Sequence, residues 1–389
     1  MPVREAFLSY AYPFSIFILL EAQNVALLAR AETSRAKSLS FFSVLASWAY
    51  LTCFVSSNDA FFDNAIGCNA TNLLLVSFRL LIVEPNTRTN AKPILDSASG
   101  WQRVKWAYKT RTSARGSENY KDKCKPTDLQ RKRDSFVRER LLWLILSFLG
   151  LDILNEITHL YNPYFTDPNY MLSRAPWPWK LTGLLHTGMV YCGLNCMYHP
   201  WAIISVATGA SEPREWPYLF GNLKEAYTVH NCWSRVWHQI MRKHLKENSA
   251  FMTKDLLRLD RSTQTVQYLE ILIAFLLSGF LHAVGESMAQ QHISLGALTF
   301  FALQPLALVT ESAVLAITSK LTRHRGLSTP SQPNMALKTL GYLWVLFWMS
   351  STLPFWLEPL MQAGFMTSYS NIPRGVTRTL LHSLISIIT

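Results

Sequence analysis

Long apolar stretches with few charged side chains recur along this 389-residue chain. A bilayer core of about 30 Å is crossed by roughly 20 helical residues, and a backbone surrounded by lipid must satisfy its hydrogen bonds internally. We therefore predict an all-α, polytopic membrane protein with about eight transmembrane helices. The predicted crossings are residues 10–29, 39–56, 66–83, 141–160, 181–207, 268–289, 293–317 and 339–357.

The composition favours the same class of protein. Hydrophobic residues make up 49% of the chain and charged residues only 16%, whereas a soluble domain carries about 25% charged residues. Six cysteines are present without any CxxC spacing, so we predict neither a metal site nor a disulfide framework.

The net charge of +12 raises the alternative of a nucleic-acid partner. However, 31 of the 37 Lys and Arg residues fall in four segments that alternating crossings place on one side of the membrane. Such a bias marks the cytosolic face, so we predict lumenal or exterior termini, no nucleic-acid partner and an integral, multi-pass protein. We expect this protein in the endoplasmic reticulum. The four segments are 30–38, 84–140, 208–267 and 318–338.

The polar stretches are predicted to be loops between crossings, so residues 1–389 are expected to form a single integral membrane domain. Two of the cytosolic loops are prominent, a basic loop over 84–140 and a second loop over 208–267.

A histidine lies deep in the sixth predicted crossing. His282 is about 14 residues beyond Tyr268, or roughly 21 Å along a helix. Ser278 and Glu286 lie four residues to either side, so the three side chains share one helix face. An ionisable side chain at this depth is costly and is a functional candidate by default. The alternative is a histidine that packs against a neighbouring helix.

A second candidate lies in the cytosolic loop over 208–267. Here a helical wheel separates apolar residues from the basic Arg235, Arg242 and Lys246, which predicts an amphipathic helix at the cytosolic interface. His238 falls at the border between the two faces. The alternative is a tryptophan-anchored surface helix with an incidental histidine. The apolar face carries Trp233, Val236, Trp237, Ile240, Met241 and Leu245.

The two stretches together resemble the wax-synthase-like branch of the membrane-bound O-acyltransferase superfamily. That branch has an FWGRRWHQ-like motif, followed by a catalytic histidine in a motif like SGLLHA. The chain departs from the first motif at Cys232, Ser234 and Val236, and it has only one of the two arginines. The matching residues are Trp233, Arg235, Trp237, His238 and Gln239 for the first motif, and Ser278, Gly279, Leu281, His282 and Ala283 for the second.

The branch includes fungal acetyltransferases of hydroxylated terpenoids and meroterpenoids, as well as wax ester synthases, and this chain is more similar to the former in length and layout. The resemblance implies an intramembrane reaction chamber, with His282 as the catalytic base and His238 in the place of the superfamily's second polar residue. It also implies acetyl-CoA (an acyl-CoA) as co-substrate, no bound cofactor, and a hydrophobic, hydroxylated small molecule that reaches the site from the bilayer.

Acyl transfer to an alcohol needs a base near the hydroxyl and hydrogen-bond donors near the developing oxyanion. Imidazole, with an ordinary pKa of about 6.5, suits the role of the base. His238 or Asn231 is the candidate donor to the oxyanion. We further predict that substrate or CoA binding involves these two motifs and their surroundings, and that Glu286 is a candidate to orient the imidazole. The predicted binding residues are Asn231, Trp233, Arg235, Trp237, Ser278 and Glu286.

Three other functions remain open from the sequence. A wax or sterol ester synthase would use long-chain acyl-CoA with the same motifs. A membrane-embedded terpene cyclase would need a carboxylic acid in its cavity, for which Glu21, Glu286 and Glu311 are available. A transporter is disfavoured because the two halves of the chain show no duplicated hydropathy pattern.

Overall fold

The computed structural model describes residues 3–30, 34–84, 99–112, 133–161, 171–260, 263–324 and 334–365. In these ranges all regular secondary structure is helical, which confirms the all-α prediction. Much of the predicted basic loop over 84–140, namely 85–98 and 113–132, lies outside the described residues.

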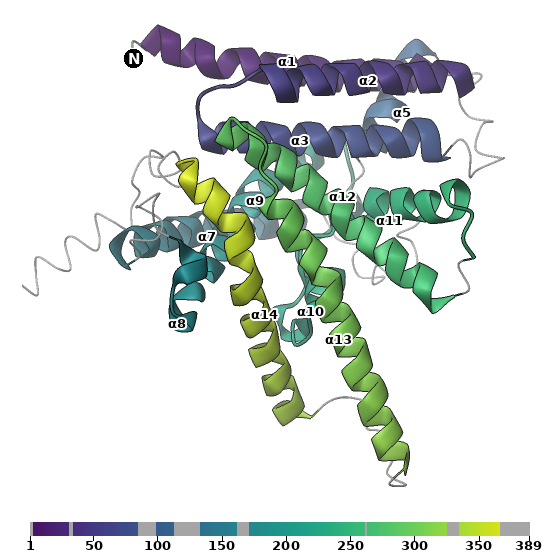
Figure 1. The fold of residues 1–389 in the computed structure, drawn as a ribbon. Coiled ribbons are helices and arrows are strands. Elements are labelled where there is room, and N and C mark those ends of the chain that lie inside the picture. The colour runs from purple at the N-terminus through teal and green to yellow at the C-terminus, as the bar shows by residue number, and fades with distance from the viewer. Residues whose placement is uncertain are drawn as a thin grey trace, which may run out of the picture. The chain divides into compact units, whose positions relative to one another are not determined.

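The helices are labelled in Figure 1. The longer ones are α1 (Val3–Arg30), α2 (Ser34–Phe54), α3 (Ala60–Phe78), α5 (Gly100–Thr112), α7 (Arg133–Tyr161), α9 (Gly183–Ala207), α11 (Arg242–Phe251), α12 (Gln264–Gln290), α13 (Gly296–His324) and α14 (Met335–Gln362). The short turns are η1 (Arg79–Val83), η4 (Leu172–Arg174), α8 (Trp177–Lys180), η5 (Pro213–Glu215), η6 (Leu223–Glu225), α10 (Val229–Asn231), η7 (Cys232–Val236) and η8 (Met252–Leu256).

Six helices in the described ranges are long and apolar enough to cross a membrane, as expected of a multi-pass membrane protein. They coincide with six of the eight predicted crossings. The other two predicted crossings coincide with α2 and α9, which are helical but do not meet the same criterion of length and composition. The count of eight is therefore not confirmed. The six candidate spans are Ser9–Arg30, Ala60–Val83, Arg133–Thr158, Gln264–Gln290, Gly296–Thr322 and Met335–Gln362.

The chain divides into two compact units, each made of two separate segments. The first unit comprises Met1–Gly116 and Ile240–Pro305, and the second comprises Ser117–Gln239 and Leu306–Thr389. The organisation of residues 1–389 as one functional domain stays a prediction.

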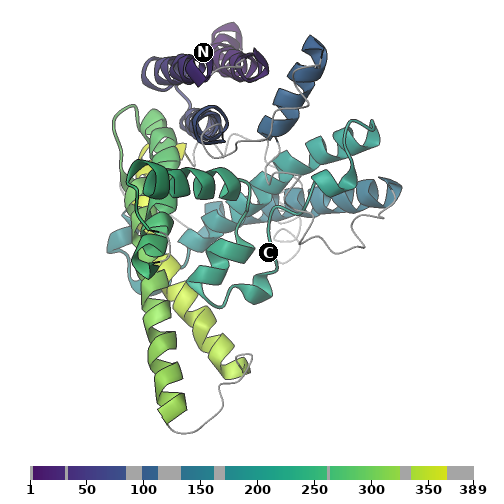
Figure 2. The same cartoon turned by 90° about the vertical axis from the view of Figure 1, so that its right-hand side faces the viewer.

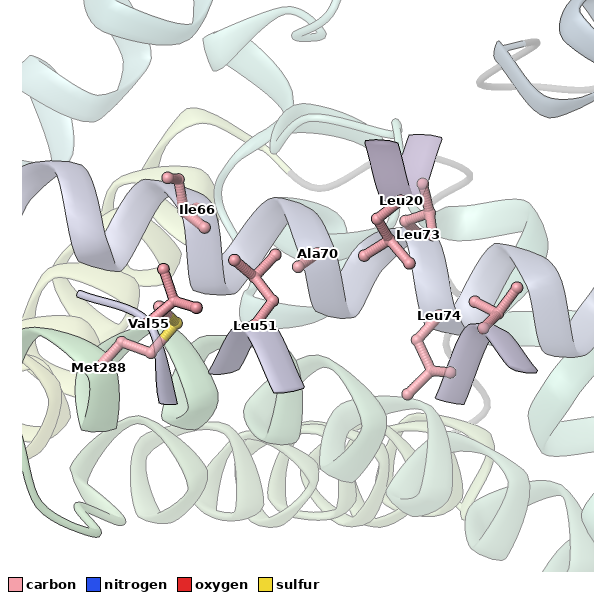
Figure 3. Close-up of a cluster of buried hydrophobic side chains, with 9 residues drawn as sticks. Leu20, Leu51, Val55, Ile66, Ala70, Leu73, Leu74 and Met288 are labelled. Carbon is pink, nitrogen blue, oxygen red and sulfur yellow. The ribbon is translucent and has the colours of Figure 1, made fainter. Parts of the chain in front are cut away.

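In the first unit, α1, α2 and α3 pack side by side and α12 packs along α3. Figure 2 looks nearly along α3, which lies below the purple pair of α1 and α2. The side chains between these helices form one apolar cluster, shown in Figure 3. Its buried members are Leu20, Val44, Leu51, Val55, Ile66, Ala70, Leu73, Leu74 and Met288.

The backbones of α3 and α12 approach closely where two glycines face each other. A methyl group on Gly67 would lie 2.7 Å from the Cα atom of Gly285. Small residues at a crossing let membrane helices pack backbone to backbone. This crossing brings the third and sixth predicted transmembrane segments together around the turn that carries His282.

In the second unit, α9 packs along α7, and α14 packs against the start of α9. Glycines again mark the close contacts, since Gly150 lies against Cys192 and Gly188 against Leu154. The chain leaves α9 at Ala207 and runs through two short turns before it reaches α10. The second candidate stretch begins there.

Candidate functional site

In the first unit, His282 lies on α12 between an aromatic ring and a thiol. The ring of Phe301, from α13, stacks on the imidazole with centroids 5.0 Å apart and an interplanar angle of 2°. The Nδ1 atom faces the Sγ atom of Cys68, from α3, at 3.7 Å. Side chains from two other helices therefore fix both the plane of the imidazole and the direction of one of its nitrogens.

The carboxylate of Glu286, one turn beyond His282, is directed at the start of α13. It is fully buried and accepts hydrogen bonds from the backbone N–H groups of Gly296 and Ala297, at 2.9 and 2.6 Å. The hydroxyl of Ser294 donates a third hydrogen bond. A carboxylate in this position satisfies N–H groups that have no partner within the helix. Glu286 thus caps α13, the helix that carries Phe301, while its predicted role in orienting His282 stays a prediction.

In the second unit, residues 229–236 form a short helix built from α10 and η7, and we call it the motif helix. The sequence predicted one amphipathic helix that continues to Leu245, and this prediction is wrong. The backbone is extended at Trp237, with ψ at 154°, and α11 begins only at Arg242. The two parts of the expected helix even belong to different compact units.

The motif helix ends because other groups take its last hydrogen bonds. The side-chain amide of Gln239 donates to the carbonyl groups of Trp233 and Trp237, at 3.1 and 2.6 Å. The N–H group of Gly221 donates to the carbonyl of Val236 at 2.8 Å. These bonds replace the ones that a continuing helix would make. A helical wheel uses only the spacing of residues and therefore does not predict them.

The start of the motif helix is held by a carboxylate from α13. Glu311 accepts hydrogen bonds from the backbone N–H groups of Val229 and His230, at 2.5 and 3.0 Å, and from the indole N–H of Trp344 at 2.9 Å. The hydroxyl of Thr228 caps the same end by accepting from the N–H group of Asn231. An anion at a helix N-terminus is favourable, because the N–H groups and the helix dipole both point at it.

The model of the membrane bound O-acyl transferase family matches residues 216–303, which include both motifs. Over these residues the chain is similar to that family, as the two motifs predicted.

Three relatives match over longer stretches, and each of them is named an acetyltransferase. Acetyltransferase eriL from Hericium erinaceus is 28% identical over 360 residues, which is 89% of this chain and 90% of that protein. Acetyltransferase aurG from Calcarisporium arbuscula is 28% identical over 283 residues, or 68% of this chain and 67% of that protein. Acetyltransferase TRI7 from Fusarium sporotrichioides is 33% identical over 159 residues, or 40% of this chain and 36% of that protein. The protein is therefore an acyltransferase.

In this acyltransferase, His238 follows the motif helix within a group of aromatic rings. Its ring centroid lies 5.4 Å from that of Trp237 and 6.0 Å from that of Phe220. Its Nδ1 atom is buried and has no hydrogen-bond partner among the described residues. Burial lowers the pKa of His238 to about 4. The imidazole is consequently neutral at physiological pH, and a neutral imidazole carries one N–H donor and one acceptor nitrogen.

The other predicted residues of the acyltransferase motif helix fall on different sides of it. Asn231 is buried, whereas Arg235 is exposed and forms a 3.3 Å ion pair with the exposed Glu225. Trp233 packs edge-on against Trp237, with ring centroids 6.3 Å apart. Arg235 is thus accessible to a polyanionic ligand, while Asn231 belongs to the packed inner side.

The structure brings together Ser278, His282 and Glu286 on α12, as the sequence predicted. It also gathers Asn231, Trp233, Trp237 and His238 around the motif helix, with Arg235 on its outer side. The two groups belong to different compact units of the acyltransferase.

Four residues that contact these groups were missed as members of the site from the sequence. Nothing in the sequence distinguishes Cys68 from the other cysteines, Phe301 and Phe220 carry no motif signal, and the sequence offers Glu311 only as the acid of a cyclase. Glu311 had one usable signal, since a carboxylate within an apolar span needs a partner.

Proposed function

We propose that this acyltransferase transfers the acetyl group of acetyl-CoA to a hydroxyl group of an apolar terpenoid or meroterpenoid, in the endoplasmic reticulum membrane and in a biosynthetic pathway of secondary metabolites. One observation carries the proposal most directly. The imidazole of His282 is held inside a candidate membrane span by Phe301 and Cys68. In the proposed reaction an apolar acceptor reaches this imidazole from the bilayer. The acetyltransferase names of the relatives support the short acyl group.

In this mechanism His282 takes the proton of the acceptor hydroxyl as the oxygen attacks the thioester carbonyl. The tetrahedral intermediate then collapses, the C–S bond breaks, and the proton passes from the imidazolium to the CoA thiolate. His238 and Asn231 are the candidates for the donor to the oxyanion, and the neutral imidazole of His238 retains an N–H group that suits this role. The exposed Arg235 binds a phosphate group of CoA once its weak surface ion pair with Glu225 opens.

The hydrogen bonds of Glu286 and Glu311 disfavour a terpene cyclase. A cyclase acid must hold a proton that it can give to the substrate. Glu286 and Glu311 each accept three hydrogen bonds from N–H or O–H donors, so their oxygens already act as acceptors in contacts that hold helices.

The proposal is tested with purified protein in detergent, by following release of free CoA thiol in the presence of hydroxylated terpenoids. Acetyl-CoA and palmitoyl-CoA are compared side by side, because preference for palmitoyl-CoA would indicate a wax or sterol ester synthase instead. Terpenoid cyclisation without thiol release would indicate a cyclase. Either result would contradict the proposal.

The assignment of the base is tested by His282→Gln and His282→Ala. Loss of a positioned general base typically lowers the rate about 10²–10⁴-fold, so we expect both variants to be monodisperse but nearly inactive. His292→Gln is the matched control, because His292 is exposed just beyond the end of α12. If His282→Gln retains more than about a tenth of the wild-type turnover, the base is another group.

The supporting role of His238 is tested by a second pair of variants. An amide donates a hydrogen bond but cannot exchange a proton at neutral pH. We therefore expect His238→Asn to keep more activity than His238→Ala. Equal and complete loss in both variants would assign His238 a proton-transfer role.

A further inference from the structure

A cysteine on α3 contacts one of the two ring nitrogens of His282. The Sγ atom of Cys68 is 3.7 Å from the Nδ1 atom of His282, within the range of a hydrogen bond to sulfur. The two residues are 214 positions apart in the sequence but belong to the same compact unit.

The close crossing of α3 and α12 holds the thiol in place. A methyl group on Gly285 would lie 2.5 Å from the Sγ atom of Cys68 and 2.7 Å from the carbonyl oxygen of Asn64. Only a glycine at position 285 leaves room for the thiol beside the imidazole. The neighbouring contact between Gly67 and Gly285 fixes the distance between the two helices.

The thiol has a second neighbour one turn earlier on α3. The S–H group of Cys68 donates to the Oδ1 atom of Asn64, with the two heavy atoms 3.9 Å apart. Because the thiol proton is directed at Asn64, the sulfur lone pairs are available to a donor on the other side. The Nδ1 atom of His282 lies on that side, so the contacts form a chain from the imidazole through the thiol to the amide.

We propose that Cys68 is a positioning residue that accepts a hydrogen bond from the protonated Nδ1 atom of His282 and, with Asn64, selects the tautomer of the imidazole in which Nε2 carries the lone pair. A neutral histidine acts as a base only through the nitrogen that lacks the proton, and the partner of the other nitrogen decides which one that is. The inference rests on the proposed role of His282 as the base. Cys68 contacts no substrate atom in this role and acts through His282 alone.

Three variants separate the hydrogen bond from packing. Cys68→Ala removes the acceptor, and we expect kcat to fall about fivefold to tenfold, the size expected for one modest hydrogen bond, with KM for both substrates unchanged. Cys68→Ser keeps an atom that accepts from Nδ1 and donates to Asn64, so it should restore kcat to within about threefold. Asn64→Leu should lower kcat in the same direction as Cys68→Ala. Cys53→Ala, at an exposed cysteine of the same unit, is the matched control and should behave as the wild type.

A double-mutant cycle distinguishes this inference from the proposed function. If Cys68 acts through His282, then adding Cys68→Ala to His282→Gln should cause no further loss of residual activity. Wild-type kcat in Cys68→Ala, with His282→Gln inactive, overturns the positioning role and leaves the base assignment intact. Full activity in His282→Gln overturns both.

A mass-spectrometric measurement tests whether the thiol of Cys68 acts instead as a nucleophile that carries the acetyl group. The wild-type protein is incubated with acetyl-CoA in the absence of acceptor and then digested. We expect no acetyl group on Cys68. An acetyl thioester on Cys68 that disappears when acceptor is added would make the cysteine a nucleophile in a two-step transfer, and the positioning role would be wrong.

Discussion

Replacement of Glu311 by alanine should release the start of the motif helix. The carboxylate is a partner of the N–H groups of Val229 and His230 and of the indole of Trp344. The motif helix spans only residues 229–236, and helices this short are not stable without tertiary contacts. Its order therefore depends on this anchor, and the position of the following His238 depends on its order.

The size of the effect follows from the burial of each donor. A hydrogen bond to a charged group contributes about 1.5–3 kcal/mol, and a buried N–H group without a partner loses that amount in full. Val229 is wholly buried, whereas His230 is exposed and water can replace the carboxylate there. Adding a smaller share for Trp344, which is partly exposed, we expect a loss of about 3 kcal/mol in local stability. That corresponds to roughly a hundredfold change in the opening equilibrium of the helix.

Hydrogen–deuterium exchange of the backbone amides in 229–236 measures the opening equilibrium of the motif helix. We expect Glu311→Ala to raise their exchange roughly a hundredfold while amides of α12 keep their wild-type rates. Glu311→Gln should have an intermediate effect, because its amide retains one acceptor oxygen. Thr310→Ala is the matched control, since Thr310 is exposed on the same turn and its hydroxyl only bonds Leu306 within the helix. Exchange within about threefold of the wild type in Glu311→Ala would refute the anchoring argument.

Three further outcomes are expected. Gly285→Ala should lower the melting temperature through a cost of about 1–3 kcal/mol at the α3–α12 crossing, whereas Gly193→Ala, which meets nothing within 4 Å, should not; equal melting temperatures would contradict the close contact. Glu286→Ala should cost about 1–3 kcal/mol by uncapping α13, and unchanged thermal unfolding would show that the cap is dispensable. Because the pKa of His238 falls from about 6.5 in the unfolded chain to about 4 in the folded one, the unfolded state binds more protons between these values, so stability should decrease as the pH is lowered from 6.5 to 4. His238→Asn should flatten that part of the melting profile relative to His230→Asn, at an exposed histidine, and parallel profiles would contradict the burial of His238.

The candidate site was predictable from the sequence to the extent that its residues lie in local motifs. Ser278, His282 and Glu286 are on one helix because spacing by four residues and an apolar surrounding are both local properties. The task of Glu286 was not predictable, because its partners lie beyond a turn at the start of α13. Periodicity describes the face on which a side chain lies and does not identify the groups that reach that face.

The amphipathic pattern over 233–245 is a second case in which a local pattern did not identify the tertiary contacts. The apolar and basic residues do alternate as a helix requires, and Arg235, Arg242 and Lys246 are exposed as predicted. The helix nevertheless ends at Val236, because Gln239 and Gly221 take up its terminal carbonyl groups. These bonds depend on where the preceding loop lies, which hydropathy does not encode.

The sequence by itself determined that this is an all-α membrane protein with a histidine inside one span and a tryptophan–histidine motif before it. Those conclusions need only the length of apolar stretches and short motifs. In lipid, a single crossing segment can satisfy its own backbone hydrogen bonds only as a helix. The tertiary structure alone decided which side chains meet: Cys68 and Phe301 at His282, and Glu311 at the motif helix. The contacts at His282 depend on how closely α3 and α12 cross. That distance is set by small residues such as Gly67 and Gly285, which are far apart in the sequence. A local sequence pattern does not predict that these two residues meet.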